Sequence, residues 1–168
     1  MVGLAPAAHG GNRTGRVFTG DASGDFLFAA LHRAGFANQA ECVARDDGLV
    51  LTGAYVAAAA RCAPPGNKPT PEEFARCLPF LAREIAALPG LKFVVALGAH
   101  GWRASIEALA ANVGERPKPL PKFAHGAEAR LGAITLLGSY HVSQQNTFTG
   151  RLTPAMLDAV LKKSREIS

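Results

Sequence analysis

A glycine-rich segment near the start of the chain, residues 3–24, carries side chains suited to holding an anionic ligand. It reads GLAPAAHGGNRTGRVFTGDASG. Glycines at this density let backbone N–H groups approach a ligand closely, and Arg13 and Arg16 supply cations for a phosphate. The segment has neither the Gly-Lys-Ser/Thr ending of a P-loop nor the spacing of a dinucleotide fingerprint. Its length favours a functional loop over an ordinary surface loop.

A second polar segment, residues 139–153, reads SYHVSQQNTFTGRLT and places one histidine among amide and hydroxyl side chains. A histidine in such a position can stabilise an anion that develops during a reaction. The alternative is a polar loop in which His141 only makes internal hydrogen bonds. A single histidine, taken by itself, favours this alternative.

The chain has three cysteines, Cys42, Cys62 and Cys77. Cys62 and Cys77 flank a turn-rich stretch that is able to wrap around a metal, but two cysteines alone are a weak metal signal. An odd count without a recognisable secretion signal disfavours a secreted disulfide framework, so we expect a cytoplasmic protein.

The elements that position these segments alternate between strands and helices. We predict strands at residues 1–4, 48–60, 93–97 and 134–140, and helices at residues 25–35, from Thr70 to about residue 88, at 101–113 and from Thr153 onward. This order predicts an α/β fold, a three-layer α/β/α sandwich with a mainly parallel sheet of about four strands, in a single domain over residues 1–168. Ligands bind at the carboxyl ends of strands in such sheets, where both polar segments begin.

Composition narrows the function further. The chain has 168 residues, 48% of them hydrophobic and 18% charged, which excludes a disordered or fibrous protein. No apolar run is long enough for a membrane span. The net charge of +5 weakly favours a polyanionic partner such as nucleic acid.

Taken in order, the motifs resemble the uracil-DNA glycosylase superfamily, specifically its B-type or family 5 iron–sulfur enzymes. Residues 3–10 (GLAPAAHG) and 18–24 (FTGDASG) are similar to the first motif of that family and its continuation. Residues 61–73 (RCAPPGNKPTPEE) are similar to its cysteine-bearing segment. Residues 139–146 (SYHVSQQN) look like its last motif, with Val142 where many members have proline.

The resemblance implies an enzyme that flips a deaminated base out of DNA and hydrolyses its N-glycosidic bond, leaving an abasic site. Uracil is the expected base, with hypoxanthine or xanthine as further substrates. Asp21 would stabilise the sugar cation or position the attacking water, and His141 would donate a hydrogen bond to the departing base. The alternative is a non-catalytic DNA-binding remnant of the same fold. A small-molecule α/β hydrolase ranks lower, because the chain lacks a Gly-x-Ser-x-Gly elbow.

The resemblance also implies contacts to substrate. The flipped base would be bound by the side chains of Phe18, Asn67 and Asn146 and by backbone N–H groups of Leu4 and Ala5. The loop that enters the DNA duplex would contribute Gln144, Gln145, Phe148 and Arg151. Ordinary structural roles stay open beside these: a helix cap for Asp21, a core position for Phe18 and a turn position for Asn67.

The family binds a [4Fe-4S] cluster through four cysteines. The resemblance makes Cys62 and Cys77 two of the ligands and places the other two upstream of the first motif, where this chain has none. We therefore expect an N-terminally truncated chain in which the cluster would hold loops rather than take part in the reaction. Neither motif loop contains a lysine for a Schiff base, so the expected enzyme is monofunctional. DNA with deaminated bases is the expected partner, a membrane is not, and a monomer is the expected state.

Overall fold

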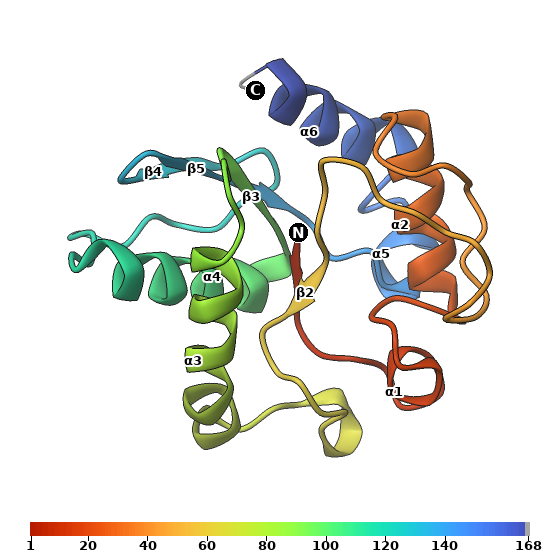
Figure 1. The fold of residues 1–168 in the computed structure, drawn as a ribbon, viewed down its shortest axis with the longest axis horizontal. Coiled ribbons are helices and arrows are strands. Elements are labelled where there is room, and N and C mark those ends of the chain that lie inside the picture. Colours follow the sequence, from red (N-terminus) through yellow and green to blue (C-terminus); the bar gives the residue numbers. More distant parts are fainter. Residues whose placement is uncertain (167–168) are drawn as a thin grey trace.

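The computed structural model describes residues 1–166, and within them five strands form one sheet in the order β2-β1-β3-β5-β4 (Figure 1). The strands are β1 (Val2–Gly3), β2 (Ala57–Ala58), β3 (Phe93–Leu97), β4 (Glu128–Leu131) and β5 (Ile134–Ser139). β1 pairs in parallel with β2 and β3, and β3 pairs in parallel with β5. β4 runs antiparallel to β5 at the edge of the sheet. The prediction of a mainly parallel sheet is confirmed.

Helices cover both faces of this sheet, which confirms the three predicted layers. On one face α2 (Ala22–Arg33) packs against α6 (Pro154–Glu166), and α6 also contacts β3 and β5. On the other face α3 (Pro71–Ala86) packs against α4 (Gly98–Val113), which contacts β1, β3, β4 and β5. Figure 1 shows the two helix pairs on opposite sides of the strands. Three short helical turns lie in the connecting loops: α1 (Gly11–Thr14), η1 (Pro65–Asn67) and α5 (Gln144–Thr147).

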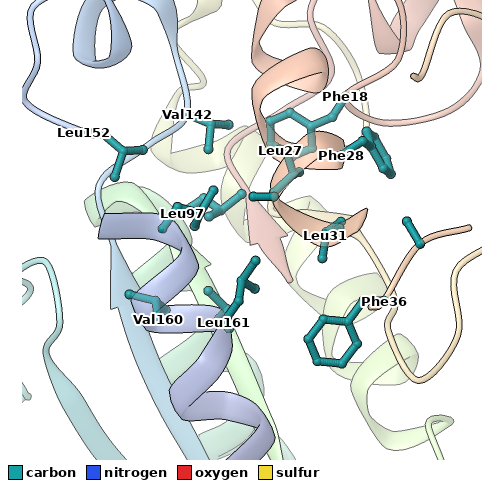
Figure 2. Packing of buried hydrophobic residues seen from close by; sticks show 14 of the residues in the cluster. Phe18, Leu27, Phe28, Leu31, Phe36, Leu97, Val142, Leu152, Val160 and Leu161 are labelled. Atoms are coloured by element: carbon teal, nitrogen blue, oxygen red, sulfur yellow. The ribbon is translucent and has the colours of Figure 1, made fainter. Parts of the chain in front are cut away.

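Two apolar clusters hold these layers together, one on each face of the sheet. Successive residues of β3 alternate between them: Val94 belongs to the cluster under α3 and α4, and Val95 to the cluster under α2 and α6. Figure 2 shows the second cluster, in which Phe18 lies beside Leu27 near one end of the packed side chains. The loop that carries Phe18 is therefore tied directly to the hydrophobic core.

Two strand predictions need correction. Residues 48–60 do not form one long strand, because only Ala57–Ala58 pair in the sheet, while Leu51 makes an isolated bridge to Ala37. Gly48 and Gly53 have φ values of +83° and +67°, which bend the chain away from an extended path. The fifth strand, β4, went unpredicted because alternate residues of it face solvent at the sheet edge and carry charges.

The helix starts follow from local capping. Thr70 accepts a hydrogen bond from the Glu73 N–H while the Glu73 carboxylate accepts one from the Thr70 N–H, so the predicted start of α3 is confirmed as a capping box. Thr153 likewise accepts from the Met156 N–H at 3.4 Å at the start of α6. α2 begins at Ala22, earlier than the predicted residue 25, and Asp21 is its N-cap residue. None of the helices within residues 1–166 has the length and apolar character that crossing a bilayer requires.

Candidate functional site

The parallel topology gathers three loops and the start of α4 at one edge of the sheet. The loops after β1, β2 and β5 leave from the carboxyl ends of parallel strands, and α4 begins directly at the carboxyl end of β3; carboxyl ends of parallel strands meet at a common edge. Figure 1 shows the segments after β1 and β2 leaving the sheet on the same side. The two polar segments singled out by sequence therefore face each other across the ends of β1 and β5.

His141 is held by contacts to its own loop and to the first residue of α4. Its Nδ1 accepts a hydrogen bond from the Ser143 N–H at 3.1 Å, and the Asn146 amide donates to its backbone carbonyl at 2.8 Å. A Cβ on Gly98, which has φ +84°, would lie 3.2 Å from the Cβ of His141. Because Nδ1 accepts a hydrogen bond, the neutral imidazole carries its hydrogen on Nε2, which is then available as a donor.

Burial of the His141 ring favours its neutral form. Burial lowers the pKa of His141 below its ordinary value of 6.5, and the nearby His100 lowers it further. The carboxylate of Asp21 acts in the opposite direction and raises the pKa of His141. Since Asp21 and His141 interact electrostatically, the structure brings these two predicted site residues into one neighbourhood.

Phe18 borders the same space. Its ring centroid lies 6.0 Å from that of His141, with the rings tilted by 41°. A Cβ on Gly3 would lie 2.6 Å from the edge of the Phe18 ring, so glycine is needed for the ring to settle there. Phe18 is only 6% exposed and packs in the core cluster (Figure 2). The core position considered from sequence is therefore correct, and the same ring also faces His141.

Asp21 is the N-cap residue of α2, the structural role considered for it from sequence. Its Oδ1 accepts a hydrogen bond from the Gly24 N–H at 2.9 Å, which caps α2. Its Oδ2 lies over Gly10, where an added Cβ would be 2.1 Å away. The cap therefore occupies one oxygen and fixes the side chain, leaving the other oxygen on the side of Gly10.

The other residues predicted to contact the base lie in three different loops. Asn67 has φ +56° and lies on the exposed turn η1, in the loop that follows β2. The Leu4 carbonyl accepts from the Ala60 N–H at 2.9 Å, which joins the start of the glycine-rich loop to the end of β2; Ala5 follows it, half-buried. Asn146 is used to hold the His141 backbone, as described above.

The residues predicted to enter DNA lie on and after α5. Gln144 and Gln145 are exposed, and Phe148 is 79% exposed, which is unusual for so large an apolar side chain. The Arg151 guanidinium lies 4.7 Å from the centre of the Tyr140 ring. An exposed aromatic tip beside two amides therefore stands at the rim of the site.

Of the two cysteines of the predicted cluster, Cys77 lies in the second turn of α3 and contacts the backbone beside Cys62. The Cys77 sulfur accepts from the backbone N–H of Arg61, the residue before Cys62, at 3.5 Å. Cys62 is exposed and Cys77 half-buried, whereas Cys42 is buried against Thr19 and Arg16. Within residues 1–166, no group of three or more His, Cys, Asp or Glu side chains is placed to hold a metal ion. The described residues therefore supply only Cys62 and Cys77 at this place and do not fit a four-cysteine cluster by themselves.

Sequence reasoning missed His100. This exposed residue stacks on Phe74, with ring centroids 5.6 Å apart and planes 11° from parallel, and its electrostatic interaction with His141 lowers the pKa of His141. It lies in the first turn of α4, three residues after β3 ends at Leu97. Its place after a buried parallel strand is the signal that would have found it.

A cavity of about 710 Å³ lies away from this site. It is lined mainly by apolar side chains, among them Met1, Phe36, Leu81 and Phe93, and Phe93 begins β3. None of the predicted site residues lines it. The chemistry-bearing side chains are thus gathered at the carboxyl edge of the sheet and not at this cavity.

Comparisons with known proteins agree with the motifs. A family model described as the uracil DNA glycosylase superfamily matches residues 1–165. The chain is 51% identical to the type-5 uracil-DNA glycosylase of Thermus thermophilus over 169 residues, which covers all of this chain and 74% of that protein. It is 48% identical over 170 residues to the type-5 uracil-DNA glycosylase of Mycobacterium tuberculosis, covering all of this chain and 62% of the relative.

A third relative, the type-5 uracil-DNA glycosylase of Pyrobaculum aerophilum, is 44% identical over 164 residues, or 98% of this chain and 69% of that protein. The chain thus spans about 62% of the length of the Mycobacterium tuberculosis relative and somewhat more of the other two. The family expected from its motifs is confirmed: this chain belongs to the uracil-DNA glycosylase superfamily, in its type-5 group.

Proposed function

We propose that the chain is a monofunctional uracil-DNA glycosylase, which hydrolyses the bond between uracil and deoxyribose in DNA and leaves an abasic site. The observation that supports this proposal is that the Phe18 ring lies 6.0 Å from the His141 ring and that Asp21 acts electrostatically on the same histidine. An aromatic face, a neutral hydrogen-bond donor and a carboxylate are the three groups that the reaction requires. The curated relatives named above, all type-5 uracil-DNA glycosylases, support the same activity.

Base flipping comes first, because a stacked base is inaccessible to the site. Unstacking and unpairing cost a few kcal/mol. The exposed Phe148, with Gln144 and Gln145, would fill the gap left in the duplex and so offset this cost. The everted base would then stack on the Phe18 ring, which Gly3 and the core hold in place.

The departing base carries negative charge, which His141 is placed to stabilise. Its Nε2–H would donate to a uracil oxygen as the glycosidic bond lengthens. Since Nδ1 already accepts from Ser143, the ring does not need to reorganise during the reaction. Backbone N–H groups of Leu4 and Ala5 and the amide of Asn67 would add further donors from the neighbouring loops.

The sugar develops positive charge in such a dissociative reaction, and Asp21 is the acid that would oppose it. The cap on α2 fixes the position of its carboxylate before substrate binds. The same carboxylate would orient the water that attacks the sugar. An aromatic face, a histidine and backbone donors do not single out one base, so hypoxanthine and xanthine are proposed as further substrates.

Cys62 and Cys77 are proposed as two ligands of the [4Fe-4S] cluster that the family resemblance implies. Because the described residues do not complete its ligand set, no step of the proposed reaction depends on it. The cluster would tie the loop after β2 to the second turn of α3. We further propose that the protein acts on DNA as a monomer and in the cytoplasm.

The test is base release from a duplex with one uracil, detected as strand cleavage after alkali. The chain is expected to produce the alkali-sensitive site, and Asp21→Asn and His141→Asn are expected to reduce it strongly. DNA binding that weakens with salt, without any base release by the unaltered chain, would instead identify a non-catalytic DNA-binding protein and overturn the proposal.

A further inference from the structure

The backbone of Phe18 is held in a conformation that its side chain disfavours. Its φ is +57°, in the left-handed region that non-glycine residues adopt only where their surroundings enforce it. The first turn of α2 packs directly on this residue, since a Cβ on Gly24 would lie 1.9 Å from the Phe18 carbonyl oxygen. Contacts from residues outside the site must therefore hold the backbone of Phe18 in this conformation.

Arg16 ties that turn from within. Its Nε donates to the Thr19 hydroxyl at 2.9 Å, bridging the residue pair Val17 and Phe18. Thr19 is fully buried, and its hydroxyl also lies 3.0 Å from the Cys42 sulfur. The Cys42 thiol in turn approaches the Phe18 carbonyl oxygen at 3.5 Å. The phosphate-binding role considered for Arg16 from sequence is thus replaced by an internal one.

Asp47 anchors the other end of the guanidinium. Arg16 Nη2 lies 2.7 Å from Asp47 Oδ2, and the Asp47 side chain is only 7% exposed. The Asp47 carboxylate also accepts the backbone N–H groups of Val43, Ala44 and Leu49. The hydrogen bond from Arg16 holds the pKa of Asp47 well below its usual range, so the pair stays charged in neutral solution.

We propose that Arg16 and Asp47 are positioning residues that set the Phe18 ring against Gly3 and His141 and thereby control the rate of base release. This inference rests on the proposed function. The two side chains act through Thr19 and Cys42 and are not placed among the groups that would meet the base. They determine where the base stacks, so loss of the pair slows the chemical step more than it weakens DNA binding.

The test compares Asp47→Asn with Asp46→Asn, a change of the same charge at the exposed neighbouring carboxylate. Single-turnover base release, DNA affinity and thermal unfolding are measured for each. Asp47→Asn is expected to slow release at least tenfold with DNA affinity changed less than twofold, while Asp46→Asn stays within twofold of the unaltered chain in both.

A second pair keeps the test decisive if Asp47→Asn does not fold. Thr19→Ser keeps the hydroxyl that accepts a hydrogen bond from Arg16. Thr19→Val keeps the shape of the side chain but removes that hydroxyl. Release by Thr19→Ser is expected to stay close to that of the unaltered chain, and release by Thr19→Val to fall at least tenfold. Equal rates for the two variants would overturn the proposal.

An activity-independent readout separates this inference from the proposed function. The Phe18 ring current affects the His141 ring protons, since the centroids are 6.0 Å apart. In NMR spectra, Asp47→Asn is expected to shift the His141 ring signals, and Asp46→Asn to leave them unchanged. If the unaltered chain releases no base, the proposed function fails while this comparison still tests the positioning. Loss of thermal stability with unmoved His141 signals and an unchanged release rate would show that the pair only stabilises the fold.

Discussion

Replacing His141 with asparagine separates the two tasks of its ring. The asparagine Oδ1 reaches about as far as Nδ1 and can still accept from the Ser143 N–H, which spans 3.1 Å in the structure. The side chain is too short to place a donor where Nε2 stands. His141→Asn therefore keeps the loop contact and removes the proposed donor to the leaving base.

The size of the effect follows from the burial of the site. Removing one pre-positioned donor to a developing anion costs about 10²–10³ in rate, or roughly 2.7–4 kcal/mol. We expect this loss in single-turnover uracil release, with DNA affinity almost unchanged. His141→Gln, whose amide reaches farther, should recover part of the rate. His32→Asn, at an exposed position in the last turn of α2, is the matched control and should behave like the unaltered chain.

The same variant also carries a prediction about pH and stability. Burial depresses the pKa of His141 below 6.5 in the folded protein. The unfolded chain therefore binds more protons near and below pH 6.5, and stability is lost as pH falls through that range. Urea unfolding at pH 7.5 and pH 5.5 should show a smaller loss for His141→Asn than for the unaltered chain. Burial also lowers the pKa of His125. His125 is present in both proteins, so its contribution cancels when the stability losses of the unaltered chain and of His141→Asn are compared.

Two results would refute this reasoning. A release rate for His141→Asn within threefold of the unaltered chain would remove His141 from the reaction. A release rate that rises steeply as pH falls below 6.5, and does so only when His141 is present, would mean that the cationic ring and not the neutral one is the donor.

Three further outcomes are expected. Gly10→Ala puts a Cβ 2.1 Å from Asp21 Oδ2 and must displace that carboxylate by about 1 Å, so release should fall about 10²-fold at unchanged DNA affinity; an unchanged rate would argue against a catalytic Asp21. Phe148→Ser, at a side chain that is 79% exposed, should slow release from duplex DNA several-fold but not from single strands, with unfolding free energy within about 0.5 kcal/mol; equal slowing on both substrates would contradict a role in flipping. Thr70→Ala breaks the capping box with Glu73 and should cost about 1 kcal/mol and roughly 2–4 °C in Tm without slowing release at 25 °C; a slower release would place the start of α3 in the site.

Local signals made much of the fold predictable. The cap at Thr70 and the apolar run of β3 each depend on a few neighbouring residues, and both appear in the structure. β4 was missed because an edge strand with one exposed face has little apolar signal. The long strand predicted at residues 48–60 was wrong because most of these residues form a bent loop, interrupted by glycines with positive φ. Its apolar side chains pack on the core without pairing in the sheet.

The parts of the site whose positions follow from the sheet topology could be predicted from the sequence. Parallel strands bring their carboxyl ends together, so the neighbourhood of Asp21 and His141 follows once both segments are placed after strands. The pairing of Arg16 with Asp47, 31 positions apart in the chain, has no local signature and so could not be predicted. The N-cap role of Asp21 was foreseen only as an alternative, because a capping acid and a catalytic acid look alike in sequence.

The central claim is that an everted uracil is gripped between the Phe18 ring and the His141 donor, beside Asp21. A crystal structure of the chain soaked with free uracil tests this most directly. The expected result is the base stacked on Phe18 with an oxygen within hydrogen-bond distance of His141 Nε2. Uracil bound instead in the cavity between Met1 and Phe93, with the space beside His141 closed by side chains, would contradict it.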